Sequence, residues 1–119
     1  MPTIMLTLTN ESATGAAILV TGAQPPPTPG NLRVNLEIGT TFGMAAGLPS
    51  MTGVPVSVSV PGYPSSFTVT WLDVGGDGVV NGGDQFVLSY STALSSGTAV
   101  SFLLIWNDGR TLSTIGWTV

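Results

Sequence analysis

The chain has 119 residues and a formal net charge of −4, a length that suits one domain and leaves no room for two full cores. Only 7% of its residues are charged, against about 25% in ordinary soluble domains. It has no Cys, His or Lys, which excludes disulfides, Cys/His zinc sites and histidine-based catalysis. The acidic balance argues against nucleic acid as a partner.

Polarity comes instead from many Ser and Thr residues, among 16 Gly and 9 Pro. No apolar run reaches the ~18–20 residues of a bilayer span, so we predict no membrane span. A surface with so few charges is poorly protected against self-association, and we expect copies of the chain as partners and no small-molecule substrate. The lack of Lys and Cys together with abundant hydroxyls is typical of extracellular proteins, so we predict a location outside the cell or on its surface.

The first apolar segments alternate with period two, the pattern of half-buried strands. Residues 3–9 place Ile4, Leu6 and Leu8 on one face, residues 15–21 carry Ile18 and Val20, and residues 10–14 are turn-like. These segments predict a hairpin or two edge strands.

The turn-like residues also include an N-x-S sequence, Asn10-Glu11-Ser12. This sequence makes Asn10 a candidate glycosylation site, and a turn that merely reads this way is the alternative.

A proline-rich segment follows, with four Pro in residues 24–30. It predicts an extended polyproline spacer of roughly 20 Å. Either it is a stiff crossover within one sandwich, or it holds an arm away from the rest. We divide the chain into an N-terminal β arm (1–23), the spacer (24–30) and a β-sandwich body (31–119).

The body contains six further segments with strand patterns and no credible helix. Gly43, Gly47 and Pro49 favour a loop over residues 40–51, Pro61 to Pro64 reads as a turn, and Asp108-Gly109 predicts a hairpin turn. About eight strands in all predict an all-β fold, an antiparallel β-sandwich of immunoglobulin-like or jelly-roll type. The body strands are expected over residues 32–38, 54–60, 67–71, 85–91, 98–106 and 112–119.

Three of the six acidic residues fall within residues 73–84, which contain no basic residue. The string D-V-G-G-D-G-V-V-N-G-G-D resembles the calcium loop of dockerin modules and EF-hands, with Gly78 at the position of the sharp turn. Gly75 departs from that pattern because it lacks a side-chain oxygen, and the flanks read as strands rather than helices. The resemblance implies structural Ca²⁺ with the ligands Asp73, Asp77, Asn81, Asp84 and the carbonyl of Val79. A Gly/Asp-rich turn without metal is the alternative.

Aromatic residues offer a weaker signal. Trp71, Trp106 and Tyr90 fall at inward positions of their strands, which favours a core role, and Tyr63 is the best exposed candidate for stacking on a sugar. A serine nucleophile would lack its usual base, so we do not expect an enzyme.

In its overall character the chain resembles the secreted β-sandwich subunits of archaeal and bacterial surface filaments and pilus-like threads. Those subunits are small, poor in Lys, and rich in Ser, Thr and Gly. The resemblance implies a structural subunit that polymerises with copies of itself by strand exchange (donor-strand complementation). The alternatives are an accessory glycan- or protein-binding module and a viral capsid or decoration protein. The candidate assembly residues are Ile4, Leu6, Leu8, Ile18 and Val20.

Overall fold

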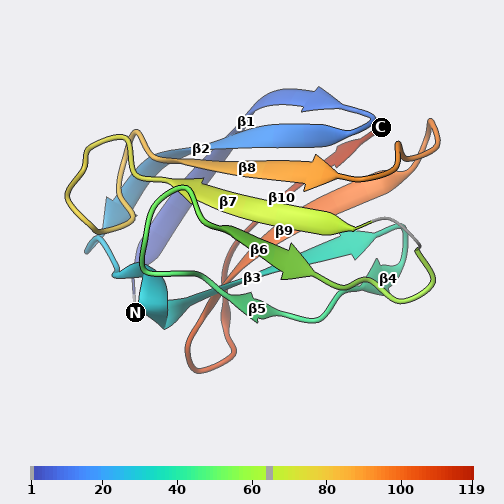
Figure 1. The fold of residues 1–119 in the computed structure, drawn as a ribbon. Helices are drawn as coiled ribbons and strands as arrows, with labels where there is room; N and C mark the ends of the chain where they lie inside the picture. The colour runs from blue at the N-terminus through green and yellow to red at the C-terminus, as the bar shows by residue number, and fades with distance from the viewer. Residues whose placement is uncertain (1, 64–65) are drawn as a thin grey trace.

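The computed structural model describes residues 2–63 and 66–119, and it is a sandwich of two antiparallel sheets (Figure 1). The first sheet has the strand order β1-β2-β8-β7-β6, with β1 Thr3–Ser12, β2 Gly15–Gln24, β6 Pro55–Val58, β7 Phe67–Leu72 and β8 Gln85–Tyr90. The second has the order β10-β9-β3-β4, and β5 also pairs with β3; its strands are β3 Leu32–Ile38, β4 Thr41–Phe42, β5 Ala46–Gly47, β9 Ala99–Trp106 and β10 Thr111–Thr118.

The predicted all-β sandwich is confirmed, with ten strands in the described residues rather than about eight. The two additional strands, β4 and β5, lie in the segment expected to be a loop. They are short because the chain bulges between them. At this bulge the Asn35 side-chain amide (Nδ2) donates a hydrogen bond to the Gly43 carbonyl at 2.9 Å. The helical part of the described chain is one 3-10 turn, Pro29–Asn31, and none of it is long and apolar enough to cross a membrane.

The core lies between the two sheets and is formed by every second residue of each strand. Phe86 of the first sheet meets Phe102 of the second with ring centroids 5.3 Å apart, and both side chains are fully buried. At one end Phe67 packs edge-on against Tyr90, also at 5.3 Å. Burial raises the pKa of Tyr90 to about 12, with a smaller effect of the Glu11 charge in the same direction. The period-two pattern of the sequence therefore identified the buried faces.

The first hairpin belongs to this core. β2 pairs with β8 over five residues, Ile18 and Val20 are fully buried, and Ile4 is 4% exposed. In the single chain residues 2–23 thus share one sandwich with residues 31–119, which is the first of the two alternatives that the sequence left open; Met1 lies outside the described residues. Strand exchange between copies stays a prediction.

The proline-rich segment takes the first of its two predicted roles, a crossover within one sandwich. It leads from β2 in the first sheet to β3 in the second. Pro27 and Pro29 are buried, and the Pro27 carbonyl accepts a hydrogen bond from the Val80 N–H at 2.8 Å. The crossover is therefore fastened to the body rather than extended into solvent.

The two lateral edges of the sandwich differ in how the sheets are connected. On one side the Met44 N–H donates to the Ser59 carbonyl at 2.9 Å and links the second sheet to the segment that follows β6. On the other side β1 and β10 lie next to each other, but in the described residues no ladder of hydrogen bonds joins them. The sandwich thus ends there in two long outer strands, each with one unpaired edge.

Ile18→Ala tests the placement of the hairpin. Because Ile18 is fully buried between β2, β8 and the second sheet, we expect the free energy of unfolding to fall by about 2–5 kcal/mol in urea denaturation. Met5→Ala is the control, since Met5 lies on the same hairpin and is 58% exposed. Equal stability of both variants and the wild type would mean that the hairpin does not pack on the body.

Candidate functional site

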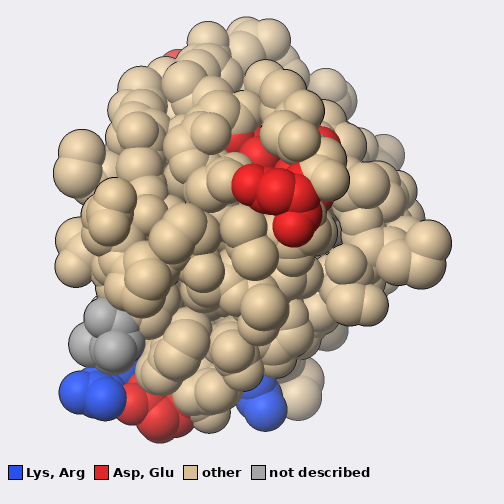
Figure 2. Space-filling view, turned by 90° about the vertical axis from the view of Figure 1, so that its left-hand side faces the viewer, with Lys and Arg blue, Asp and Glu red and all other residues tan. Residues whose placement is uncertain are grey.

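The acidic loop, residues 73–84, connects β7 to β8 and is anchored to the core. Val80 is fully buried, the Val20 N–H donates to the Asp84 carbonyl, and the Gly83 N–H donates to the Val20 carbonyl, both at 2.8 Å. Figure 2 looks onto this end of the molecule and shows a cluster of acidic atoms surrounded by uncharged residues. The loop is thus a defined element whose outer residues are exposed.

The carboxylates of Asp73 and Asp77 hold the loop in shape. Asp73 accepts hydrogen bonds from the N–H groups of Gly76 (3.0 Å) and Gly78 (2.7 Å), one on each oxygen. Asp77 accepts from the Val79 N–H at 3.3 Å and from the Asn81 side-chain amide. Gly76 and Gly78 have φ values of 68° and 78°, which only glycine adopts without strain. The residues predicted as ligands therefore bond to one another and to the loop backbone.

Asp84 has a different environment from the other two carboxylates. Its side chain is fully buried, and Oδ2 accepts hydrogen bonds from the Trp71 indole N–H (3.1 Å) and the Asn81 N–H (3.2 Å). Its Oδ1 has no hydrogen-bond partner. Burial raises the pKa of Asp84, the charge of Asp73 adds to this effect, and the hydrogen bonds from Asn81 and Trp71 oppose it. A buried carboxylate with one unpaired oxygen is a cost to the folded state.

This geometry matches the Gly/Asp-rich turn that was the alternative to a calcium loop. In the part of the chain that the structure describes, no three acidic side chains converge on a point where they could hold a metal ion. The oxygens of Asp73 and Asp77 face N–H groups of the loop. Calcium binding by Asp73, Asp77, Val79, Asn81 and Asp84 stays a prediction.

The predicted assembly residues lie inside the chain's own sandwich. Ile4, Ile18 and Val20 are buried in the core, and Leu6 and Leu8 are half-buried against it. A neighbouring copy could contact them only after the hairpin had left its place. The structure therefore brings these residues together in the core of the chain's own sandwich, and they do not form a free surface for assembly.

Asn10, the candidate glycosylation site, is exposed near the end of β1, where it pairs with Ala17 of β2. An exposed asparagine near a hairpin turn is accessible to a modifying enzyme. Its glycosylation stays a prediction.

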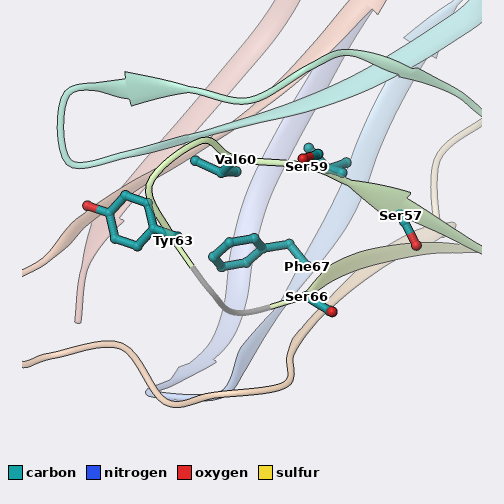
Figure 3. Close-up of a pocket in the computed structure, with 7 residues that line it drawn as sticks. Ser57, Ser59, Val60, Tyr63, Ser66 and Phe67 are labelled. Atoms are coloured by element: carbon teal, nitrogen blue, oxygen red, sulfur yellow. The ribbon is translucent and has the colours of Figure 1, made fainter.

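Tyr63 borders a cavity of about 220 Å³ at the end of β6 (Figure 3). The ring is half-buried, and it packs edge-on against Phe67 at 6.5 Å and 71°. Of the predicted turn around it, Pro64 lies outside the described residues. Tyr63 is thus less available for stacking on a sugar than the sequence suggested. The residues that line the cavity are Ser57, Val58, Ser59, Val60, Tyr63, Ser66 and Phe67.

Trp106 is more accessible than its place in the strand pattern predicted. Trp71 and Tyr90 are buried as expected, but Trp106 is the last residue of β9 and is half-exposed. It borders a hollow of about 310 Å³ whose other walls are largely proline: Pro2, Pro25, Pro26 and Pro27, with Thr28 and Asn31. Trp106 lies at the end of its strand, where the alternating pattern no longer determines burial. This position was the sequence signal that could have predicted its exposure. Glycan binding at either aromatic residue stays a prediction.

Large exposed apolar side chains were also missed by the sequence reasoning. They lie on the outer face of β1 and on the loops around β4, β6 and β7, and they are Met5, Phe42, Met44, Met51, Val54 and Val74. Four of them, Phe42, Met44, Met51 and Val74, lie within segments that the sequence predicted only as loops, so no alternating pattern was available to predict their exposure.

No family model matches the chain, and no curated protein sequence matches it. Among solved structures, it is similar to the archaellum periplasmic stator protein FlaG from Sulfolobus acidocaldarius, with 16% sequence identity and a TM-score of 0.47 over 98% of this chain and 99% of that chain. A likeness of this degree carries no conclusion about function.

Asp73→Ala tests the role of the carboxylates in the loop. Because Asp73 accepts two backbone hydrogen bonds, we expect the unfolding free energy to fall by about 1 kcal/mol in urea denaturation in EDTA, where no calcium contributes.

A thermal melting experiment with and without calcium tests calcium binding. A site with a Kd of ~1 mM would be stabilised by about 1.4 kcal/mol at ~10 mM calcium. A rise in Tm that Asp77→Ala abolishes would support calcium, and an unchanged Tm would contradict it.

Asp84 predicts a specific pH dependence of stability. Because its folded pKa is raised above the ordinary value of 3.8, the folded chain binds this proton more tightly than the unfolded chain does. The contribution of Asp84 to the unfolding free energy should therefore be largest below pH 3.8, fall as the pH rises through the folded pKa, and stay low above it.

Asp84→Asn isolates this effect, since an amide does not titrate and keeps an oxygen for the Trp71 N–H. The other carboxyl groups are the same in both proteins, so their contributions cancel in the difference. We expect the stability difference between wild type and variant, from urea unfolding at a series of pH values, to change across this window. A constant difference would contradict the raised pKa.

Proposed function

We propose that the chain is a structural subunit of an extracellular or cell-surface assembly built from copies of itself. The observation that supports this best is the chemistry of the outer strands β1 and β10. Glu11 is the one charged residue in either strand. Natural sheets commonly protect such edges with Lys, Pro or bulges, because unpaired N–H and C=O groups are a template for another strand.

β10 is the more open of the two edges. β1 has bulges at Met5/Leu6 and at Leu8/Asn10, which twist an edge away from regular pairing. β10 runs in unbroken register from Ser113 to Thr118 along its partner β9. A strand from another copy can add to this edge through main-chain hydrogen bonds. When the added strand is not the β10 of the other copy, the contact joins unlike surfaces and repeats into an open fibre or layer.

Strand exchange is the second route to assembly that we propose, and it uses the first hairpin with Ile4, Leu6, Leu8, Ile18 and Val20. The crossover after the hairpin carries no ladder pairing between residue 24 and β3. A hairpin that left its own β8 and paired with the β8 of a neighbour would regain the same contacts. Such an exchange costs little free energy beyond the ordering of the chains.

The edge route is tested with Thr118→Lys, which places a charge on β10. We expect the wild type to form fibres or layers in electron micrographs at high protein concentration, and the variant to lose them, because lysine opposes edge pairing. Thr40→Lys is the control; Thr40 is exposed in the turn between β3 and β4. A wild type without any assembly under these conditions would contradict the proposal, as would a control that fails in the same way.

Strand exchange is tested in the same preparations with the double variant Ala17→Cys/Val87→Cys. These two residues are register partners across β2 and β8, and the chain has no other cysteine. After oxidation of assembled protein, exchange predicts a ladder of covalent multimers on a non-reducing gel. Monomers alone, with the disulfide formed inside each chain, would show that the hairpin remains paired with the β8 of its own chain.

A further inference from the structure

The outward face of the second sheet carries its own pattern of charge and apolar surface. Val34 and Leu36 of β3 and Phe102 and Leu104 of β9 point into the core, so the alternate residues point outward. Phe42 of β4 is the register partner of Glu37 and shares its face. Asn35, midway between Arg33 and Glu37, is 8% exposed and donates to the Gly43 carbonyl. We refer to the more exposed outward residues as the β3–β9 outer face: Arg33, Glu37, Phe42, Leu103 and Ile105.

Two opposite charges mark the ends of the β3–β9 outer face. Arg33 and Glu37 are four residues apart on one strand, which separates them by about 13 Å. In the described residues neither takes part in an ion pair; the one ion pair joins Arg110 to Asp108 in the β9–β10 turn. Within the described residues neither charge therefore has an ion-pair partner, and Asp108 lines the hollow beside Arg33 without bonding to it.

The apolar part of the face lies between and beside these charges. Leu103 and Ile105 are half-buried on β9, and Phe42 is 57% exposed beside Glu37. At the opposite end the surface is hollowed next to Arg33, with a volume of about 370 Å³. Gly47 is the register partner of Arg33, and a Cβ built on it would meet no atom within 4 Å. One end of the face thus projects an aromatic ring, and the other end has open space.

We propose that this face binds a second copy of the chain across a two-fold axis that lies between the sheets, perpendicular to their strands. In this arrangement β3 stacks on β3 of the second copy with the strand directions reversed. Arg33 then faces Glu37 of the second copy, and the reciprocal pair forms at the other end. The Phe42 ring lies over the open space at Gly47 of the second copy, next to an arginine side chain on which it can stack.

The charges select this axis over the other one available to stacked sheets. A two-fold axis along the strands would place Arg33 on Arg33 and Glu37 on Glu37, which costs several kcal/mol of repulsion at a desolvated interface. The selected arrangement is self-complementary, so it closes as a dimer and does not propagate. It leaves the outer edges of β1 and β10 free. The inference rests on the proposed assembly from copies and names one of its contacts, with the dimer as the repeating unit.

Charge reversal tests the dimer, measured by analytical ultracentrifugation in the Thr118→Lys background so that edge pairing does not interfere. Arg33→Glu or Glu37→Arg alone should raise the dimer Kd by about a hundredfold or more, because each places two pairs of like charges in contact. The double variant Arg33→Glu/Glu37→Arg restores both pairs and should return the Kd to near the parent value. Phe42→Ala should weaken the dimer through a different contact. All three positions are outward-facing, and circular dichroism checks that each variant is folded.

Glu11→Arg is the matched control; it makes the same charge change as Glu37→Arg on an exposed position of β1 and should leave the dimer unchanged. The proposal is overturned if the parent protein stays monomeric at millimolar concentration, or if the single and double reversals weaken the dimer equally. Fibres that persist unchanged in Arg33→Glu would overturn this contact while supporting the proposed function. A charge-dependent dimer without fibres in the wild type would support this contact and contradict the proposed function.

Discussion

The pairing of β2 with β8 is the constraint on which the rest of the architecture depends. It joins the first residues of the chain to a strand that follows more than sixty residues later, and it closes the core over Ile18 and Val20. The Pro-rich crossover, the anchor of the acidic loop on β2, and the place of β1 as an outer strand all follow from this one ladder. Because these contacts are far apart in sequence, we expect the chain to fold slowly, as sandwich folds rich in non-local contacts do.

Much of this fold could be read from the sequence, because strand alternation is a local property. The eight longer strands and the Asp108-Gly109 turn were all predicted from patterns of a few residues. The two-residue strands β4 and β5 escaped because their position is set by the Asn35 side chain, which bonds to a backbone group eight residues away. Whether the first hairpin joined the body could not be decided either, since β2 and β8 are complementary only in three dimensions.

The acidic loop shows why motif spacing alone leaves a calcium loop and a tight turn both open. Asp, Asn and Gly are the residues of calcium loops and equally the residues of tight turns, because short carboxylates and amides cap backbone N–H groups. Spacing alone does not distinguish oxygens that converge on one point from oxygens that bond to the backbone. The structure separates the roles: Asp73 and Asp77 shape the turn, whereas Asp84 is enclosed beneath it with the Trp71 indole.

The scarcity of basic residues limits the number of sites at which a trypsin-like protease can cleave the chain. An enzyme that cleaves after Lys or Arg finds two sites in the whole chain, Arg33 and Arg110. Arg33 lies inside β3, between β9 and the short strands, and backbone held in a ladder is not cut until it unfolds locally. Arg110 lies in an exposed turn, and a nick there would leave β10 attached to the sandwich by its ladder with β9. Trypsin-like proteolysis would therefore leave the folded particle in one piece, a property that would suit the extracellular assembly proposed above.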